Sequence, residues 1–302
     1  MALPVLYAAR TPRDQSIEAL REMYRLGKNL TVGNIYYVDG PPPNGCGSNS
    51  NDGLSPTSAL LTIRAALNKC ADLHDDYIIV MDCYQQETFP INIDKSRVHI
   101  LGVANWGGMY TQMFPAGDTA IFTITTKGYI EIAYFSLGAG SHHAPIEFLS
   151  ITLEARSWIH NCWLGVQWPA QDGILTAVGE SPEIMIEHCL FGKLLTRDGI
   201  RIEGASTRTI IRYNIFREVA LVGIHVVAIN TDLGAIIGNR FSLPPQAGTG
   251  AAIDIAAGSV GCLIDDNHAM EGKIITTNVP YRDLGGCNWG LNWRHVTVCP
   301  PT

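Results

Sequence analysis

The sequence predicts an all-β fold in which one chain winds into a single-stranded parallel β-helix. Two interleaved repeats predict this fold, because each places a short alternating apolar segment about every 25 residues. A third observation is that no stretch between Ile121 and Val279 has the period that an α-helical solenoid requires. Strands that return after each such interval stack at about 4.8 Å, the spacing of neighbouring strands in a sheet.

The first repeat is an apolar signature that starts with isoleucine and places Cys or Asn three residues later. Its lead isoleucines are spaced by 27, 25, 25 and 28 residues, and a weaker copy lies 27 residues earlier. The lead positions are Ile132, Ile159, Ile186, Ile211, Ile236 and Ile264. The Cys and Asn positions are Cys162, Cys189, Asn214, Asn239 and Asn267. We expect these five side chains to form an internal ladder, because amides can hydrogen-bond along a stack and thiols fill the same volume.

The second repeat is a small residue followed by alternating apolar positions. Its isoleucines step by 25, 28, 26, 24 and 29 residues. They are Ile121, Ile146, Ile174, Ile200, Ile224 and Ile253. Because successive side chains of a strand point to opposite faces, the residues that follow these isoleucines should form an outward column. From the second turn on, this column is Glu147, Leu175, Arg201, His225 and Asp254.

An amphipathic helix is predicted at about residues 57–70, with Ser55 or Thr57 as its N-cap. Its apolar face consists of Leu60, Ile63, Leu67 and Cys70. We expect this helix to cap the N-terminal end of the coil, where the first turn would otherwise expose unpaired strand groups. The first strands should then come from Val80 and from residues 98–101.

A second amphipathic helix is predicted over residues 14–26, with Asp14 as N-cap and Gly27 as C-cap. Its apolar face consists of Ile17, Leu20 and Tyr24. This helix either lies on its own β-helix or forms an anchoring arm that docks on a neighbouring subunit or a larger particle. The sequence is compatible with both.

These features divide the chain into three parts: an N-terminal arm at 1–35, the β-helix at 36–277 and a C-terminal cap or tail at 278–302. The tail lacks the clear repeat and contains Trp289 and Trp293. Large aromatic side chains serve equally well to cover the last turn of a coil and to make oligomer contacts.

Charge and hydropathy exclude several classes of protein. The net charge is −7 and there are only 21 Lys and Arg residues, which argues against nucleic-acid binding. No apolar run is long enough for a membrane span. The segment Met1–Arg10 lacks a basic start and is interrupted by Pro4, so it is not predicted to be a signal peptide. The sequence therefore predicts a soluble protein made in the cytoplasm.

The eight cysteines include no CxxC pair, so a zinc site is not predicted. A chain with a full core does not need disulfides, and we expect mostly reduced, buried thiols. Cys287 and Cys299 are the first pair to test for a disulfide bond.

The repeat, together with the segment from Asn51 to Leu67, resembles the right-handed parallel β-helix (pectate-lyase-like) superfamily over roughly residues 36–277. The chain is most similar to bacteriophage virion-associated β-helix proteins. The resemblance implies a head decoration, fibre or tail-associated protein, usually a homotrimer, in a virion assembled in the host cytoplasm. The superfamily also contains lyases, hydrolases and epimerases, so the fold alone does not decide the function.

A rigid rod with an N-terminal arm fits a non-enzymatic structural protein that binds other virion proteins through that arm, without a cofactor. Two alternatives remain open at this stage. One is a polysaccharide-degrading enzyme, either a lyase or a glycoside hydrolase, such as a receptor-cleaving tailspike. The other is a glycan-binding module that uses Trp and Tyr side chains as platforms for a surface glycan.

The best catalytic candidates are Arg201, His225 and Asp254, which should lie on three successive turns. A carboxylate beside an imidazole can transfer protons, and a cation can hold an anionic sugar. Opposite charges stacked along a sheet also stabilise an ordinary exterior. A similar outward column, His160, Glu187 and Arg212, follows from the first repeat. The acidic pairs of pectin hydrolases and the Asp clusters of calcium-dependent lyases have no counterpart, which disfavours an enzyme.

Asn49, Asn51 and Asp52 precede Gly53 and are the only candidate metal ligands that the motifs suggest. Their side-chain oxygens are of the type that binds Ca²⁺. The same residues are typical of tight turns, which is the simpler interpretation.

Overall fold

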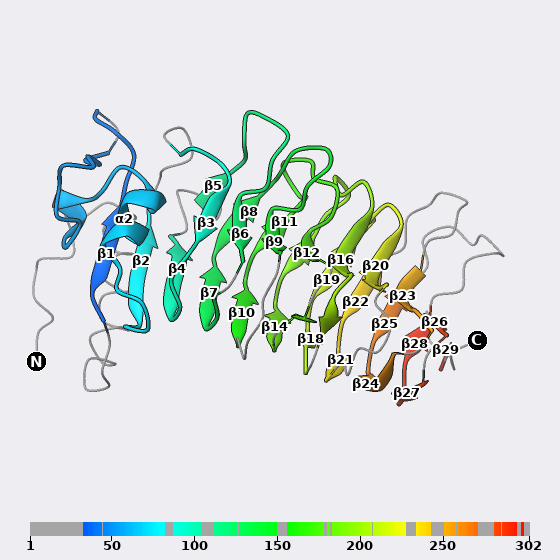
Figure 1. Ribbon diagram of the computed structural model, residues 1–302. Helices are drawn as coiled ribbons and strands as arrows, with labels where there is room; N and C mark the ends of the chain where they lie inside the picture. The colour runs from blue at the N-terminus through cyan, green and yellow to red at the C-terminus, as the bar shows by residue number, and fades with distance from the viewer. Residues whose placement is uncertain are drawn as a thin grey trace, which may run out of the picture.

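The computed structural model is an all-β parallel solenoid with very little helix (Figure 1). It describes residues 33–298 except 44, 82–86, 104–110, 126, 150–155, 178–179, 182, 207, 228–233, 243–250, 258, 271–280, 285 and 295–296. The strands stack along one long axis, with β1 near one end and β27 near the other. The amphipathic helix predicted at 14–26 lies outside the described residues.

Three long sheets form the walls of the solenoid, and neighbouring strands within them are parallel except at one C-terminal pair. The ten-stranded sheet contains β1 (Ile35–Val38), β2 (Asp76–Val80), β4 (Val98–Gly102), β7 (Ile130–Ala133), β10 (Ser157–His160), β14 (Ile184–Glu187), β18 (Ile210–Arg212), β21 (Ala235–Ile237), β24 (Val260–Asp265) and β27 (Gly286–Trp289). The eight-stranded sheet contains β3 (Ile91–Ile93), β6 (Phe122–Ile124), β9 (Ile146–Phe148), β12 (Ile174–Thr176), β16 (Asp198–Ile202), β20 (Val222–Val226), β23 (Ala251–Ile255) and β26 (Tyr281–Asp283).

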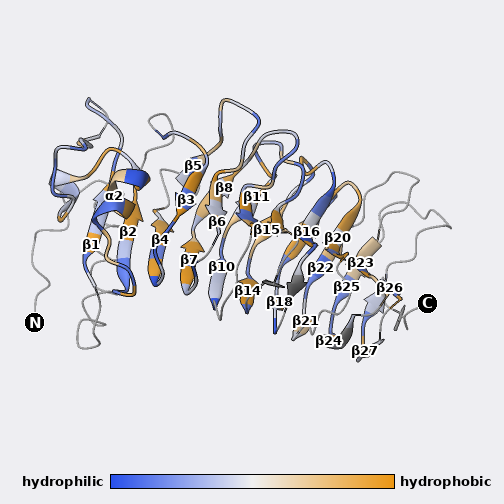
Figure 2. Cartoon of the chain, in the orientation of Figure 1, coloured by the Kyte–Doolittle hydropathy of each residue, from blue (hydrophilic) through white to orange (hydrophobic). Residues whose placement is uncertain are grey.

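The nine-stranded sheet contains β5 (Thr111–Met113), β8 (Phe135–Leu137), β11 (Trp163–Leu164), β15 (Leu190–Phe191), β19 (Ile215–Arg217), β22 (Arg240–Ser242), β25 (His268–Met270), β28 (Trp293–Arg294) and β29 (Thr297–Val298). A separate short pair joins β13 (Glu180–Ser181) to β17 (Ala205–Ser206). Hydrophobic and hydrophilic residues are mixed along the stacked strands, as expected for strands with one buried face (Figure 2).

The lead isoleucines of the first repeat are stacked in the ten-stranded sheet, as predicted. Ile159 pairs with Ile132 on one side and with Ile186 on the other. The series continues through Ile211 and on to the last two lead positions, and all six side chains are buried. The sequence period therefore equals one circuit of the coil.

The second repeat is confirmed from Ile146 onward, where the isoleucines pair in register along the eight-stranded sheet. Its first member was assigned one residue too early. Phe122, and not Ile121, pairs with Ile146. The backbone amides of Ile121 and Phe122 both donate to the carbonyl oxygen of Pro145, at 3.1 and 2.9 Å, so the chain contains one extra residue at this point.

The small residue of the second repeat leaves room for a phenylalanine of the same turn. A Cβ atom on Gly199 would lie 2.6 Å from the Phe216 ring, and one on Gly223 would lie 2.5 Å from the Phe241 ring. These rings stack on each other with centroids 4.7 Å apart, and Phe191 continues the stack at 4.6 Å. Glycine is therefore needed where a ring approaches the backbone.

The predicted internal ladder of amides is present at the corner that follows the ten-stranded sheet. Asn239 accepts hydrogen bonds from the backbone N and Nδ2 of Asn214, at 3.0 and 3.1 Å. It donates from Nδ2 to Asn267 Oδ1, at 2.9 Å. Asn292 extends the ladder by one more turn and was not predicted. Cys162 and Cys189 occupy the same column and are buried free thiols.

The segment predicted as one helix at 57–70 contains two short elements. A 3-10 turn, Pro56–Ser58, has Ser55 as its N-cap, and helix α2, Ile63–Lys69, has Thr62 as its N-cap. The buried side chains of α2 join the main core. The first strand is β1, which precedes this segment, and it pairs with β2.

The sheets continue beyond residue 277. Strands β26 and β27 pair in parallel with β23 and β24, and β28 pairs with β25 before β29 turns back antiparallel to it. Of the predicted disulfide pair, Cys287 is a free thiol and Cys299 lies outside the described residues. None of the other described cysteines forms a disulfide bond.

Candidate functional site

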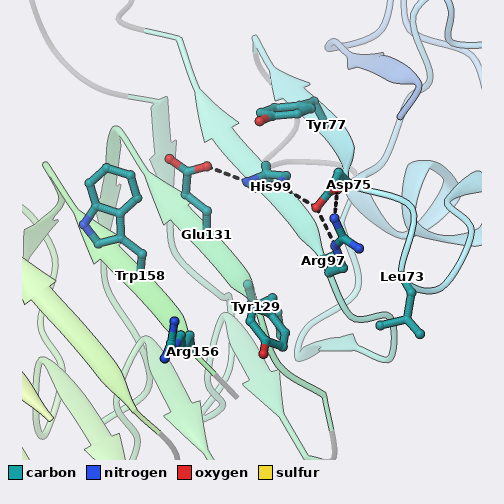
Figure 3. A pocket seen from close by; sticks show the side chains of 10 residues that line it. Leu73, Asp75, Tyr77, Arg97, His99, Tyr129, Glu131, Arg156 and Trp158 are labelled. Atoms are coloured by element: carbon teal, nitrogen blue, oxygen red, sulfur yellow. Dashed lines mark hydrogen bonds and ion pairs between the residues drawn. The ribbon is translucent and has the colours of Figure 1, made fainter. Parts of the chain in front are cut away.

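A groove of about 760 Å³ lies on the outer face of the ten-stranded sheet, across β2, β4, β7 and β10 (Figure 3). Its floor is a single column of side chains, one from each strand. Tyr77 pairs with His99, His99 with Glu131, and Glu131 with Trp158. Each of the last three directly precedes a buried isoleucine of the ten-stranded sheet, namely Ile100, Ile132 or Ile159, so alternation turns it outward.

The rim of the groove is a second column, two residues earlier in each turn. It consists of Asp75, Arg97, Tyr129 and Arg156. Asp75, Arg97 and Tyr129 have φ values of 58°, 58° and 57°, so the chain turns sharply at this corner before each strand begins. The corner holds long side chains beside the floor.

Glu131 lies at the centre of the floor, between two imidazoles. Its Oε2 is 2.6 Å from His99 Nδ1 and its Oε1 is 2.8 Å from His160 Nε2. Burial alone would raise the pKa of Glu131, but the hydrogen bonds and charges of the two histidines outweigh it and lower the pKa to about 2. The carboxylate is therefore ionised at neutral pH.

Asp75 is held by its neighbours on the rim. It forms a two-pronged ion pair with Arg97, whose Nε lies 2.8 Å from Asp75 Oδ1. Its Oδ1 also lies 3.8 Å from His99 Nε2. His99 thus stands between two carboxylates, and Figure 3 shows this line of contacts across the groove.

Aromatic side chains provide most of the apolar surface. Tyr77 stacks on His99 with ring centroids 4.2 Å apart, and Trp158 stacks on His160 at 3.8 Å. Trp158 is 36% exposed and Tyr129 is 45% exposed. The histidines fix the orientation of two rings, while Trp158 and Tyr129 keep surface available to a ligand.

A second hollow of about 230 Å³ continues the groove toward β14 and β18. It shares Arg156 and Trp158 with the first hollow. Glu183 accepts a hydrogen bond from Arg156 Nε at 2.8 Å and also pairs with Arg208. The floor column runs on here through Met185, so the two hollows form one path along the solenoid axis.

The predicted triad of Arg201, His225 and Asp254 is brought together on β16, β20 and β23 of another sheet. Arg201 Nη1 lies 3.0 Å from His225 Nδ1, and His225 Nε2 lies 3.7 Å from Asp254 Oδ2. Asp254 also forms a two-pronged pair with Arg282. The register of this outward column agrees with the prediction, and its catalytic role stays a prediction.

Asp198 belongs to this cluster and was not predicted. Its Oδ2 accepts from Arg201 Nη1 at 2.8 Å and lies 2.9 Å from His225 Nδ1. Asp198 is buried, and Glu203 binds Arg201 Nε at 2.6 Å on the other side. The charges of this cluster are thus already paired with one another.

The predicted metal ligands are used within their own loop. Asn49 Oδ1 accepts from the backbone N of Leu61 at 3.0 Å, and Asn51 Nδ2 donates to the carbonyl oxygen of Ala59 at 2.8 Å. Asp52 accepts from Ser58 Oγ at 2.6 Å, which lowers the pKa of Asp52. Among the described residues, no group of three or more His, Cys, Asp or Glu side chains is arranged to hold a metal ion.

In comparisons with known proteins, no family model matches the chain and no curated protein is a significant match. Within the part of the chain that the structure describes, no helix has the length and apolar character needed to cross a membrane.

Of the predicted outward column His160, Glu187 and Arg212, the groove uses His160 as support for Glu131. Glu187 instead binds Arg212 and accepts from Trp158 Nε1 at 3.0 Å. The floor itself was missed by the sequence analysis. Its signal is the residue immediately before a lead isoleucine, which is Glu before Ile132 and Trp before Ile159, and the same holds for His before Ile100 one turn earlier.

Proposed function

We propose that this chain is a non-enzymatic β-helix protein that binds a carbohydrate along the groove of the ten-stranded sheet. One observation carries the proposal: Tyr77, His99, Glu131 and Trp158 form a continuous outward column. This column combines exposed aromatic surface with fixed polar groups in a concave site, which is typical of sites for small polar ligands.

The chemistry of the column suits a sugar chain. The apolar face of a sugar ring can stack on Trp158 or Tyr129, and its hydroxyl groups can donate to the Glu131 carboxylate. Arg156 and Arg208 have 70% and 65% exposed side chains and can donate hydrogen bonds to sugar hydroxyl groups or pair with an acidic substituent. Successive turns lie about 4.8 Å apart, comparable to the length of one sugar residue.

The state of Glu131 supports binding over hydrolysis. Glycoside hydrolysis usually needs two carboxyl groups, one of which must be protonated to donate to the leaving group. The pKa of Glu131 is lowered to about 2 by its two histidines, so this group is not an acid at neutral pH. Asp75 is engaged by Arg97 on the other side of the groove.

The wider role in this proposal is a rigid component of a bacteriophage particle. The resemblance to right-handed, pectate-lyase-like β-helix proteins of virions supports this role, together with the low content of charged residues. In this proposal α2 caps the coil, the arm at 1–35 anchors the chain to other virion proteins, and three copies assemble. A groove on the long wall of a rod would then face a glycan of the host surface.

The test is a glycan-binding screen with the full chain, a Trp158→Ala variant and a Trp163→Ala control. Trp163 lies on β11 in another sheet, so its replacement removes an indole without touching the groove. We expect a bound glycan class whose affinity falls at least about tenfold in Trp158→Ala only. Equal loss in both variants, or no binding by the intact chain, would refute glycan binding at this groove.

The enzymatic alternative is tested on the same glycans. We expect no release of reducing or unsaturated sugars by the intact chain. Release that disappears in His225→Ala or Asp254→Ala would instead assign catalysis to the cluster on the eight-stranded sheet.

A further inference from the structure

Two cysteines face each other across the last two strands of the ten-stranded sheet. In the register of β24 and β27, Val260 pairs with Gly286 and Leu263 pairs with Asn288. Two residues of β24, Gly261 and Cys262, therefore lie opposite the single residue Cys287. Gly261 has φ 78°, as expected for the extra residue of a bulge. This leaves Cys262 as the partner of Cys287.

The geometry of this pair suits a covalent bond. Directly opposite residues of neighbouring strands lie about 4.8 Å apart, within the roughly 4.4 to 6.8 Å between Cα atoms that a disulfide spans. Cys262 is fully buried, and Cys287 packs on the same core while remaining partly exposed. Both side chains therefore point to the same side of the sheet.

The two thiols lie opposite each other in this register and interact electrostatically. The influence of each thiol on the other raises the pKa of Cys262 and lowers the pKa of Cys287. A thiolate is the reactive form of cysteine, and partial exposure allows a reagent to reach it. Because Cys287 is partly exposed and Cys262 is fully buried, Cys287 is the attacking thiol and Cys262 the resolving thiol.

We propose that Cys262 and Cys287 are a modification site, at which a small disulfide of the glutathione type converts the two thiols into an intramolecular disulfide. The Cys287 thiolate attacks one sulfur of the reagent, whose S–S bond breaks and releases one thiolate. Cys262 then loses its proton and attacks the Cys287 sulfur, which releases the second thiolate. Two cysteines are oxidised, one reagent disulfide is reduced to two thiols, and the bond ties together the last two turns of the sheet.

This inference is independent of the proposed glycan binding. It replaces the pairing of Cys287 with Cys299 that the sequence suggested. The buried pair Cys162 and Cys189 provides a contrast within the same chain, because both thiols are at most 2% exposed and a reagent cannot reach them in the folded protein.

Trypsin separates the three C-terminal cysteines, because cleavage follows Arg240, Lys273, Arg282 and Arg294. Cys262, Cys287 and Cys299 then lie in peptides 241–273, 283–294 and 295–302. The full, folded chain is incubated with oxidised glutathione, its remaining thiols are blocked with N-ethylmaleimide after unfolding, and the digest is analysed by mass spectrometry without reduction.

We expect peptide 241–273 joined to peptide 283–294, with Cys162 and Cys189 blocked as free thiols. The joined peptide should persist in Cys299→Ser and vanish in Cys262→Ser and Cys287→Ser. In Cys262→Ser, Cys287 should instead retain glutathione, which shows that the folded chain still presents the attacking thiol. A bond between Cys287 and Cys299, or Cys287 that retains glutathione in the unmodified chain, would overturn the proposal.

Discussion

The imidazole of His160 on β10 lies against the carboxylate of Glu131 on β7, with Nε2 2.8 Å from Oε1. The two residues are not paired opposite each other, since Glu131 is opposite Trp158 and His160 is opposite Ala133. The contact therefore crosses diagonally from the floor column to the column beside it. It fixes the carboxylate in the groove and orients the ring on which Trp158 stacks.

Replacing Glu131 by Gln should reduce the loss of stability in acid. Because the folded pKa of Glu131 is about 2, below the ordinary glutamate value of 4.5, its ionised form stabilises the fold above pH 4.5, and this contribution disappears as the pH falls toward 2. The shift corresponds to about 3 kcal/mol. Denaturant unfolding of both proteins at pH 7, 4 and 2.5 measures this difference in the free energy of unfolding. A difference that stays constant across these pH values would contradict the assignment.

Replacing Glu87 by Gln should stabilise the chain in alkaline solution. Burial raises the pKa of Glu87 to about 7, and one of its carboxylate oxygens has no hydrogen-bond partner. The stability that its protonated form provides is present below pH 4.5 and is lost as the pH rises through 7. Glu87→Gln should therefore be more stable than the unmodified chain at pH 8.5, by about 2 kcal/mol.

The control for Glu87 is Glu218→Gln, at an exposed position. It should leave the pH profile of the unfolding midpoint unchanged. If Glu87→Gln follows the same profile as this control, Glu87 is not the group that titrates.

Replacing Asn239 by Ala should cost about 3 kcal/mol or more. The amide of Asn239 connects Asn214 to Asn267 and also donates to the carbonyl oxygen of Ile211 at 3.0 Å. Its removal leaves several buried polar groups without partners, each costing about 1 to 3 kcal/mol. Cys162→Ala, in the same column, removes only weak sulfur contacts at 3.3 and 3.8 Å and should cost less. If Asn239→Ala and Cys162→Ala lower the free energy of unfolding in urea equally, the amide ladder does not contribute more stability than the thiols.

Replacing Gly199 by Ala should destabilise the protein by about 1 to 3 kcal/mol through overpacking. The new Cβ would lie 2.6 Å from the carbonyl oxygen of Gly223 and 2.6 Å from the Phe216 ring. Gly117→Ala is the matched control, because its Cβ would meet nothing within 4 Å. Thermal unfolding compares the melting temperatures of the two variants. If Gly199→Ala melts at the same temperature as Gly117→Ala, the phenylalanine rings can shift without a loss of stability.

The ladders were predictable because each turn must place apolar side chains inside and repeat them with the length of the circuit. The prediction slipped at Ile121 and Phe122, which are adjacent and both apolar. The apolar–polar alternation does not show which of these two residues pairs with Ile146. In the structure both backbone amides donate to the carbonyl oxygen of Pro145, and Phe122 is the one that pairs. The segment 57–70 was wrongly predicted as one helix. Ser55, one of the two predicted N-caps, caps only the 3-10 turn, and Thr62, which was not predicted, caps α2.

The groove was harder to predict because it lies on the least regular turns. The isoleucines at 78, 100 and 132 are 22 and 32 residues apart, which hides the stacking of Tyr77, His99 and Glu131. Arg201 and His225 are easier to recognise in the sequence, because their turns are evenly spaced. Three-dimensional register was needed to show that the irregular turns carry the concave, aromatic surface.

The most direct test of the account is residue-level footprinting of the chain with the glycan that the screen identifies. Hydroxyl radicals oxidise exposed indole rings, and mass spectrometry reports the extent for each tryptophan. We expect saturating glycan to protect Trp158 on the groove floor, while Trp163 on the neighbouring sheet reacts as before. Unchanged oxidation of Trp158, or protection of Trp163 alone, would contradict it.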